Sequence, residues 1–362
     1  MKRILALDGG GIRGVFSLEV LRRMQELLRA HFGSPNLVLA DHFQFFAGTS
    51  TGAIIATCLS WGMDVEDILR IYVEHGKTMF AHVPWYRPVK RLLVSRYEAG
   101  PLSELLQRVF SEDDAGRVPA LLGSSRLRTL LLVVVRNHST GSAWPITNNP
   151  RAKYNDRTLP DCNLDIPLWK IVRASTAAPV FFDPEEITLG DRRFVFVDGG
   201  ITPYNNPALI AARTAVLPGY NVGWDRGPDK LRVVSVGTIR TTSAAFNKTA
   251  QQMWLGYHLP RIPAALIEGI SQEQDFICRC LGDCLHGEPI DSEIGDLIDA
   301  TPRERKWFSY VRYNQSFRGS EAEELLATSA NVTKLDAMRA IPRLRELGRA
   351  YAAKHVALGH LL

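Results

Sequence analysis

Hydrophobic positions along the chain follow two patterns, short apolar runs and longer stretches in which apolar residues recur three and four positions apart. The apolar runs at 4–7, 43–47, 127–135 and 231–237 predict buried strands. The stretch 15–28 places apolar and charged residues at helical spacing and predicts an amphipathic helix. Since strands and helices alternate, we expect an α/β fold with a mostly parallel central sheet that helices cover on both faces.

The pattern changes at about residue 241. Beyond it the strand patterns fade and helical patterns dominate, for example at 321–326 and 335–347. No stretch rich in Gly or Ser separates the two parts. We therefore expect a core domain over residues 1–240 and a mainly helical C-terminal extension over residues 241–362 that packs on it.

The composition is that of a folded protein, because 46% of the 362 residues are hydrophobic and 22% are charged. The net charge of +5 weakly favours an anionic membrane surface or a phosphate ligand and does not indicate a DNA or RNA partner. The N-terminal apolar run and the longest one, at 130–135, are too short for a signal peptide or a membrane span. Five cysteines in such a chain fit a reducing compartment, so we expect a cytoplasmic protein that reaches lipid from the water side.

The first candidate for chemistry is the turn between the apolar run at 43–47 and the helical stretch after it. It contains Ser50 in the pattern G-x-S-x-G, in which Gly48 and Gly52 allow a sharp strand-to-helix reversal. Such an elbow presents the serine hydroxyl as a nucleophile at the carboxyl end of the sheet. Taken alone, the pentad fits equally well a glycine-rich turn whose serine caps the helix.

A second glycine-rich segment follows the apolar run at 4–7. Its G-x-G-x-x-G spacing matches the dinucleotide-binding fingerprint, but that motif needs an acidic residue roughly 20 positions further on, and Asp41 falls too late. Successive glycines also offer bare N–H groups, either to the oxyanion of an acyl-transfer intermediate or to a phosphate in a non-catalytic nucleotide-binding regulator. We favour an oxyanion hole. The three successive glycines Gly9, Gly10 and Gly11 would supply its N–H groups, Arg13 would add positive charge, and Gly14 completes the motif.

A serine nucleophile needs a base that takes its proton. The nine histidines lie in helical, loop or C-terminal segments, and none follows a strand within a compact turn. Asp198 does, because the turn Asp198-Gly199-Gly200 ends a predicted strand, where an α/β sheet carries its reactive groups. A poorly solvated aspartate with a raised pKa can act as the base. A Ser-His-Asp esterase that uses His258 or His286 stays the alternative, and Asp-Gly-Gly alone is commonly only a turn.

The three glycine-containing motifs at 8–14, 48–52 and 198–200, in this order and at these distances, resemble the patatin-like phospholipase family. The segments 96–102 and 173–182 resemble it as well. The resemblance extends from about residue 4 to residue 209, and the rest of the chain lies outside it. It implies a patatin-like three-layer α/β fold.

The resemblance also implies an activity, the hydrolysis of acyl esters in lipids. In this family's pattern Ser50 and Asp198 form a catalytic dyad without histidine, and Gly10, Gly11 and Arg13 form the oxyanion hole. The expected reaction passes through an acyl-enzyme on Ser50 that water then hydrolyses. No metal or other cofactor is required for that chemistry.

A narrower resemblance links the chain to the bacterial effector phospholipases of cyclic-oligonucleotide antiphage defence, through its first residues, 1–11, and the segment 305–314. It implies activation by a cyclic dinucleotide such as 3',3'-cyclic GMP-AMP, and cleavage of membrane phospholipids at the cytoplasmic face of the inner membrane. It also allows a homo-oligomer. The aromatic and basic residues from Trp307 to Arg312 would stack on bases and pair with phosphates. An ordinary amphipathic strand explains the same segment equally well.

Two further features have competing interpretations. Cys278, Cys280 and Cys284 lack the paired C-x-x-C hooks of a structural zinc site, so buried thiols explain them better than a metal. The segment 82–91, interrupted by prolines and rich in aromatic and basic residues, is a candidate lid that inserts into lipid. A solvated loop is the alternative.

Overall fold

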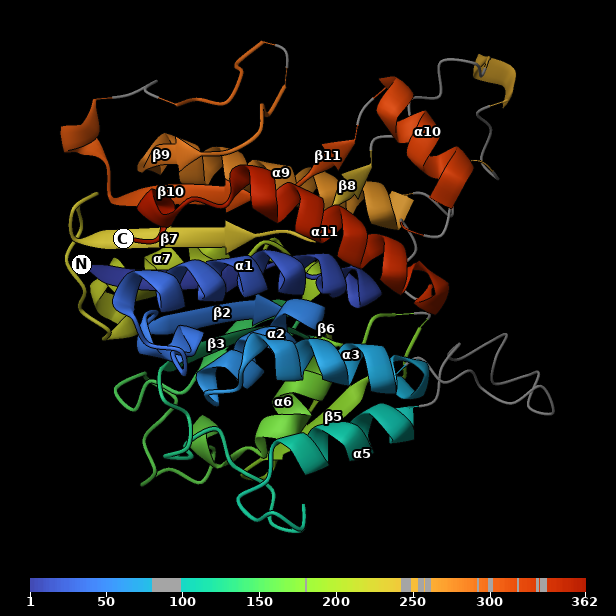
Figure 1. The fold of residues 1–362 in the computed structure, drawn as a ribbon. Helices are drawn as coiled ribbons and strands as arrows, with labels where there is room; N and C mark the ends of the chain where they lie inside the picture. Colours follow the sequence, from blue (N-terminus) through green and yellow to red (C-terminus); the bar gives the residue numbers. More distant parts are fainter. Residues whose placement is uncertain are drawn as a thin grey trace.

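The computed structural model describes residues 1–79, 99–179, 181–241, 249–252, 257, 262–291, 293–298, 302–317, 319–329, 332 and 337–362. Within these residues nine strands form one central sheet in the order β5-β6-β3-β2-β1-β7-β10-β9, with β4 beside β3 (Figure 1). The strands of this sheet are β1 (Lys2–Leu7), β2 (Phe45–Thr49), β3 (Leu130–Asn137), β4 (Ser142–Thr147), β5 (Glu185–Leu189), β6 (Arg192–Asp198), β7 (Leu231–Val236), β9 (Gly282–His286) and β10 (Phe308–Tyr313). The short strands β8 (Arg240–Thr241) and β11 (Ser316–Phe317) pair with each other.

The sheet is mostly parallel, with its antiparallel pairs confined to β3, β4, β5 and β6. In the centre of the sheet Leu7 of β1 lies opposite Gly48 of β2 and Val236 of β7. The loops that follow these three strands therefore meet at one edge. That edge is where a parallel sheet carries its site.

Helices cover both faces of the sheet, as the alternation along β1 requires. Leu5 and Leu7 belong to one hydrophobic cluster, with α1 and α11, whereas Ile4 and Ala6 belong to a second one, with α7. Figure 1 shows α1 and α11 side by side on one face and α7 and α9 on the other. The α/β three-layer fold expected from the sequence is confirmed. The helices are α1 (Gly14–Phe32), α2 (Thr51–Ser60), α3 (Val65–Met79), α5 (Ala99–Val109), α6 (Leu168–Ser175), α7 (Ala208–Val216), α9 (Ile262–Leu281), α10 (Gly319–Ser329) and α11 (Ile341–His355).

The C-terminal part is not only helical, because β9 and β10 join the central sheet. β10 lies between β7 and β9, parallel to both, and all six of its residues are buried. Of the two interpretations of Trp307 to Arg312, the structure therefore favours the strand, which includes residues 308–312 of that segment. Trp307, just before it, is half-buried, with the guanidinium of Arg226 4.1 Å from the centre of its ring.

The three cysteines between residues 278 and 284 are spread over two elements. Cys278 and Cys280 belong to α9 and Cys284 to β9, and burial raises the pKa of the Cys284 thiol to about 11. Among the residues that the structure describes, no three His, Cys, Asp or Glu side chains are grouped so that they could hold a metal ion.

Within the described parts of the chain, no helix has the length and apolar character needed to cross a bilayer. The candidate lid at 82–91 and His258 lie outside the described residues.

Candidate active site

The loop from β2 to α2 forms a strained elbow around Ser50. Ser50 has φ 54° and ψ −123°, a conformation that non-glycine residues rarely adopt and that is typical of functional sites. A Cβ atom at Gly48 would overlap the carbonyl oxygen of Gly52, and one at Gly52 would overlap that of Leu7. Both glycines are therefore required by the close approach of the backbone, as the pentad predicted.

Hydrogen bonds from neighbouring loops hold this elbow. The backbone N–H of Ser50 donates to Ser175 Oγ at 2.9 Å, and Ser175 Oγ in turn donates to the carbonyl of Val134 at 2.7 Å. The hydroxyl of Thr49 donates to the carbonyl of Tyr204 at 2.6 Å. Ser175, at the end of α6, thus ties the elbow to β3, a role that the sequence alone did not reveal.

The Ser50 hydroxyl donates a hydrogen bond to Asp198 Oδ2 at 2.7 Å. The second carboxylate oxygen, Oδ1, accepts the N–H of Gly200 at 2.6 Å. Burial raises the pKa of Asp198 to about 6, although the Gly200 N–H, the Ser50 hydroxyl and the charge of Arg173 act in the opposite direction. A Cβ at Gly199 would overlap a backbone oxygen of β3, so the turn needs glycine there. The carboxylate is thus placed to accept the serine proton.

The glycine run after β1 lies beside the elbow, since a Cβ at Gly9 would be 3.2 Å from Ser50 Cβ. The N–H of Gly9 donates to the carbonyl of Asn205 at 3.1 Å. The N–H groups of Gly10 and Gly11 find no hydrogen-bond acceptor among the residues that the structure describes. Within the described residues, two amides of the run that begins beside the serine are therefore free to bind an oxyanion.

Three positions of the run, Gly10, Gly11 and Gly14, require glycine. A Cβ at Gly10 would overlap the hydroxyl of Thr238, which is buried, and one at Gly14 would lie 2.6 Å from Thr51 Oγ1. Gly11 has φ +59°, in the left-handed region that favours glycine. Each of these three positions thus has its own steric reason for glycine.

Arg13 contacts the glycine run but not the serine. Its Nε donates to the carbonyl of Gly10 at 3.2 Å and its Nη1 to that of Ile239 at 3.3 Å. Burial lowers the pKa of the guanidinium below its usual value. Arg13 therefore braces the loop through the carbonyls of Gly10 and Ile239. Its membership of the oxyanion hole stays a prediction.

His286, the described histidine of the alternative esterase, lies in a different environment. Its ring is 5.0 Å from that of His360, 5.4 Å from that of His355 and 5.2 Å from that of Tyr313. Burial lowers its pKa to about 4, and the neighbouring histidines act in the same direction. Ser50 is hydrogen-bonded to Asp198 instead, so the geometry favours the carboxylate as base.

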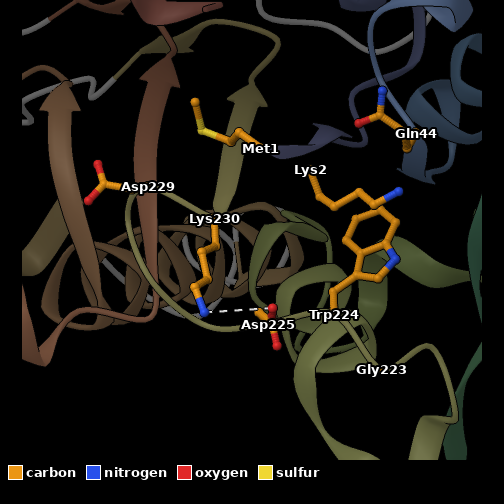
Figure 2. Close-up of a pocket in the computed structure, with 8 residues that line it drawn as sticks. All are labelled: Met1, Lys2, Gln44, Gly223, Trp224, Asp225, Asp229 and Lys230. Atoms are coloured by element: carbon orange, nitrogen blue, oxygen red, sulfur yellow. Dashed lines mark ion pairs between the residues drawn. The ribbon is translucent and has the colours of Figure 1, made fainter.

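A hollow on the described surface lies away from the dyad. It has a volume of about 620 Å³ and includes Lys2, Trp224 and Lys230, with the Lys2 ammonium 5.5 Å from the centre of the Trp224 ring (Figure 2). Lys2 begins β1 and Lys230 precedes β7, so the hollow is at the amino end of the sheet. Ser50 and Asp198 lie at the opposite end.

A family model described as patatin-like phospholipase matches residues 5–212 of the chain. The chain belongs to the patatin-like phospholipase family. The resemblance stated from the three glycine motifs is thus confirmed, and with it membership of a family of lipid acyl hydrolases.

Individual relatives are more distant. A cGAMP-activated phospholipase of Escherichia coli is 26% identical over 260 residues, which are 70% of this chain and 67% of that protein. One of Vibrio cholerae is 27% identical over 217 residues, 58% of this chain and 56% of the other. Patatin-17 of Solanum cardiophyllum is 26% identical over 267 residues, 69% and 63% of the two chains. The chain spans about two thirds or less of the length of these relatives.

Proposed function

We propose that this patatin-like protein is a serine acyl hydrolase that cleaves the acyl esters of membrane phospholipids through a dyad of Ser50 and Asp198. The observation that carries the proposal is the hydrogen bond of 2.7 Å between the Ser50 hydroxyl and a buried carboxylate. Free amides of the glycine run lie next to it. These are the nucleophile, base and oxyanion donors that acyl transfer needs.

In the first half of the reaction Asp198 takes the proton of the Ser50 hydroxyl while Oγ attacks the ester carbonyl carbon. The carbonyl oxygen becomes an oxyanion, to which the N–H groups of Gly10 and Gly11 donate. When the intermediate collapses, the C–O bond to the glycerol breaks and the leaving oxygen takes the proton from Asp198. The products are the lysophospholipid and an acyl ester on Ser50.

In the second half water is the nucleophile. Asp198 accepts a proton from the water as its oxygen attacks the acyl carbon, and the second tetrahedral intermediate is held by the same amides. Collapse releases the fatty acid, and the proton on Asp198 returns to Ser50 Oγ. One residue thus serves as base and acid in both halves.

Fatty-acid release from phospholipid vesicles tests this proposal. We expect Ser50→Ala to lower the rate by a factor of about 10⁴ or more, as loss of a catalytic nucleophile does. Ser60→Ala is the matched control, because Ser60 is a buried serine of α2 whose hydroxyl bonds to Thr129 and not to the dyad. Ser50→Ala with more than a tenth of the normal rate would show that the nucleophile is wrong.

We propose further that the enzyme works in the cytoplasm, peripherally on the inner membrane, in antiphage defence, and that a cyclic dinucleotide such as 3',3'-cyclic GMP-AMP activates it. The relatives of Escherichia coli and Vibrio cholerae, named as cGAMP-activated phospholipases, support this. Since β10 is buried, its residues do not supply the binding surface.

Vesicle cleavage and calorimetry across a panel of cyclic dinucleotides test the gating. We expect slow cleavage by the protein without nucleotide and an increase of at least tenfold with one cyclic dinucleotide of the panel. Light scattering shows whether the protein forms a homo-oligomer. Rapid cleavage without nucleotide contradicts the gating and leaves the hydrolase intact. Binding without fatty-acid release favours a non-catalytic regulator instead.

A further inference from the structure

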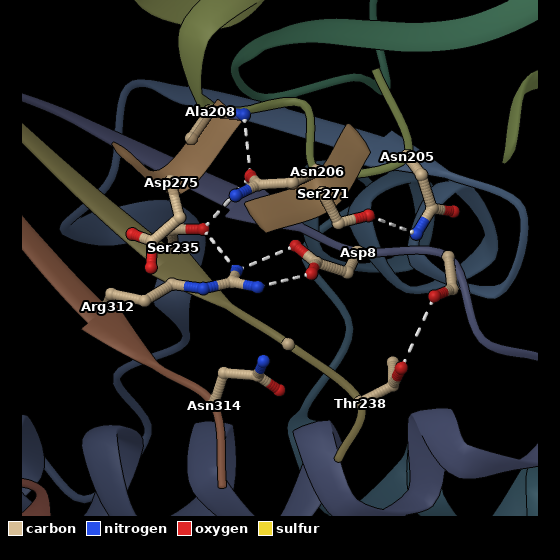
Figure 3. A network of polar contacts seen from close by, with 12 residues as sticks. Asp8, Asn205, Asn206, Ala208, Ser235, Thr238, Ser271, Asp275, Arg312 and Asn314 are labelled. Atoms are coloured by element: carbon tan, nitrogen blue, oxygen red, sulfur yellow. Dashed lines mark hydrogen bonds and ion pairs between the residues drawn. The ribbon is translucent and has the colours of Figure 1, made fainter. Parts of the chain in front are cut away.

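A buried ion pair connects the C-terminal part of the chain to the residue before the glycine run. Arg312 of β10 donates to both carboxylate oxygens of Asp8, from Nη1 to Oδ1 at 2.8 Å and from Nη2 to Oδ2 at 2.6 Å (Figure 3). Only 4% of the Arg312 side chain and 6% of that of Asp8 are exposed. Arg312 Nη1 also donates to Ser235 Oγ of β7 at 2.7 Å, so the contact joins β10, β7 and the residue that follows β1.

Such a pair needs a reason beyond stability. Removing two charges from water is costly, and apolar residues of similar volume often stabilise a fold as well or better. Burial lowers the pKa of Arg312, but the charge of Asp8 and its hydrogen bonds outweigh it and raise that pKa above its usual value. The bidentate geometry fixes the carboxylate in both position and plane, which a point charge or an apolar contact would not do.

The segment that follows Asp8 is fixed at further points. The Asp8 N–H donates to the carbonyl of Val236 at 3.0 Å, the Gly9 N–H to that of Asn205 at 3.1 Å, and the Thr238 hydroxyl to the Gly9 carbonyl at 3.3 Å. The bonds to Asp8 and Gly9 thus hold the backbone up to the point where the amides of the expected oxyanion hole begin. Of these contacts, the pair with Arg312 is the one that holds the Asp8 side chain.

We infer that Arg312 is a positioning residue of the active site, which orients the oxyanion amides of Gly10 and Gly11 through the Asp8 carboxylate. The inference rests on the proposed function of the glycine run. β10 lies beyond residues 5–212, the part that the family model matches, so a strand outside that part completes the site. Arg312 does not touch the substrate in this arrangement, and its contribution is geometric.

Turnover by the variants Arg312→Lys and Asp8→Asn tests this inference. The value of kcat is expressed per active serine, titrated with a fluorophosphonate, so that unfolded protein is not counted. We expect kcat to fall about tenfold to a hundredfold, the cost of a small displacement of catalytic groups, with KM within about twofold. The acid limb of the pH profile should stay where it is, because Asp198 is untouched. Arg232→Met is the matched control, since Arg232 is a buried arginine of β7 that bonds to Ser309 and Gly359 instead.

A kcat within twofold of the normal value in both variants would overturn the inference, as would an equal loss in Arg232→Met. If a single variant does not fold, the double variant Asp8→Asn with Arg312→Met, which removes both charges, replaces it. Slow turnover by the folded double variant supports the inference and normal turnover contradicts it. Ser50→Ala in the same assay separates the two proposals, because an active Ser50→Ala variant contradicts the function itself.

Discussion

Two strands of the sheet lead into the same tripeptide, Asp-Gly-Gly, which begins at Asp8 directly after β1 and at Asp198, the last residue of β6. The two turns differ in what lies opposite the carboxylate. Both aspartates are 5% exposed. Asp8 is paired through both oxygens with a guanidinium. Asp198 faces the Ser50 hydroxyl and a backbone N–H, and within the described residues no cationic side chain lies at ion-pair distance from it. The sequence of the turn is shared, and its surroundings decide the role.

The two aspartates are thus suited to different roles, Asp8 to holding a position and Asp198 to accepting a proton. A carboxylate in a bidentate pair keeps its charge and holds a position, but its lone pairs are already committed to the guanidinium. Burial raises the pKa of both aspartates, but at Asp8 the charge and hydrogen bonds of Arg312 act against it. Asp198 has no such partner, its pKa is raised to about 6, and it readily accepts a proton near neutral pH. The following predictions test this comparison, from the largest effect to the smallest.

Neutralising the two aspartates should affect stability in different ways. We expect Asp8→Asn to lower the free energy of unfolding by about 3–5 kcal/mol, because the buried charge of Arg312 is left without a partner. Asp198→Asn should leave that free energy unchanged or raise it, because it removes a desolvated carboxylate. Urea unfolding at pH 7 measures both, and equal losses in the two variants would remove the distinction.

Filling the glycine run should impair catalysis more than folding. In Gly10→Ala the new methyl group overlaps the Thr238 hydroxyl, so the run must shift away from its place beside Ser50. We expect kcat to fall about a hundredfold to a thousandfold, the usual loss for one oxyanion donor. Gly219→Ala, at a position with open space around the missing Cβ, is the control. A Gly10→Ala enzyme within threefold of the normal kcat would rule out these amides as the hole.

The difference in pH dependence between the unchanged protein and Asp198→Asn should report the ionisation of Asp198. Its pKa is about 6 in the folded protein and about 3.9 when unfolded, so the folded state binds the proton more tightly. The contribution of Asp198 to the free energy of unfolding should therefore fall by up to about 3 kcal/mol as the pH rises from 4 to 6. Asp198→Asn should not show this loss. Melting temperatures of the two proteins across this range measure it. The melting temperature of Asp198→Asn minus that of the unchanged protein should grow as the pH rises. A value that stays constant with pH would contradict the raised pKa of Asp198.

The same ionisation should govern activity. Because only the ionised carboxylate accepts the serine proton, kcat/KM should fall about tenfold per pH unit below pH 6. Asp8→Asn should keep this limb at the same pH. A shift of this acid limb in the variant Asp8→Asn would mean that the two turns are not independent.

The smallest effect is expected for His286. Its neighbours are His355, His360 and Tyr313, and it does not share a hydrogen bond with Ser50. His286→Gln should therefore keep kcat within twofold, measured on vesicles beside Asp198→Asn. Loss of turnover with an intact fold would restore the Ser-His-Asp alternative.

The sequence was informative where the chemistry is local. Ser50 and Asp198 could be found because each sits in a short glycine motif at the end of a strand, and glycine there reports backbone crowding that the structure shows. The α/β class followed from periodicity in the same way. Both signals are contained within a few neighbouring residues.

The contribution of the C-terminal part could not be predicted in this way. Arg312 is separated from Asp8 by 304 positions, and in a strand rich in aromatic residues a lone arginine is equally typical of a ligand-binding surface. Its burial depends on a partner carboxylate that sequence periodicity does not reveal. Ser175 was missed for the same reason, since its partners, the Ser50 N–H and the Val134 carbonyl, are backbone groups 125 and 41 positions away in the sequence.

The turnover of Asp198→Asn on phospholipid vesicles tests the central claim most directly. The variant keeps the size of the side chain and removes its ability to take the Ser50 proton, while the oxyanion donors stay in place. We expect kcat per folded molecule to fall by a factor of about 10⁴. A kcat within tenfold of the normal value, in a variant with an unchanged melting temperature, would contradict it.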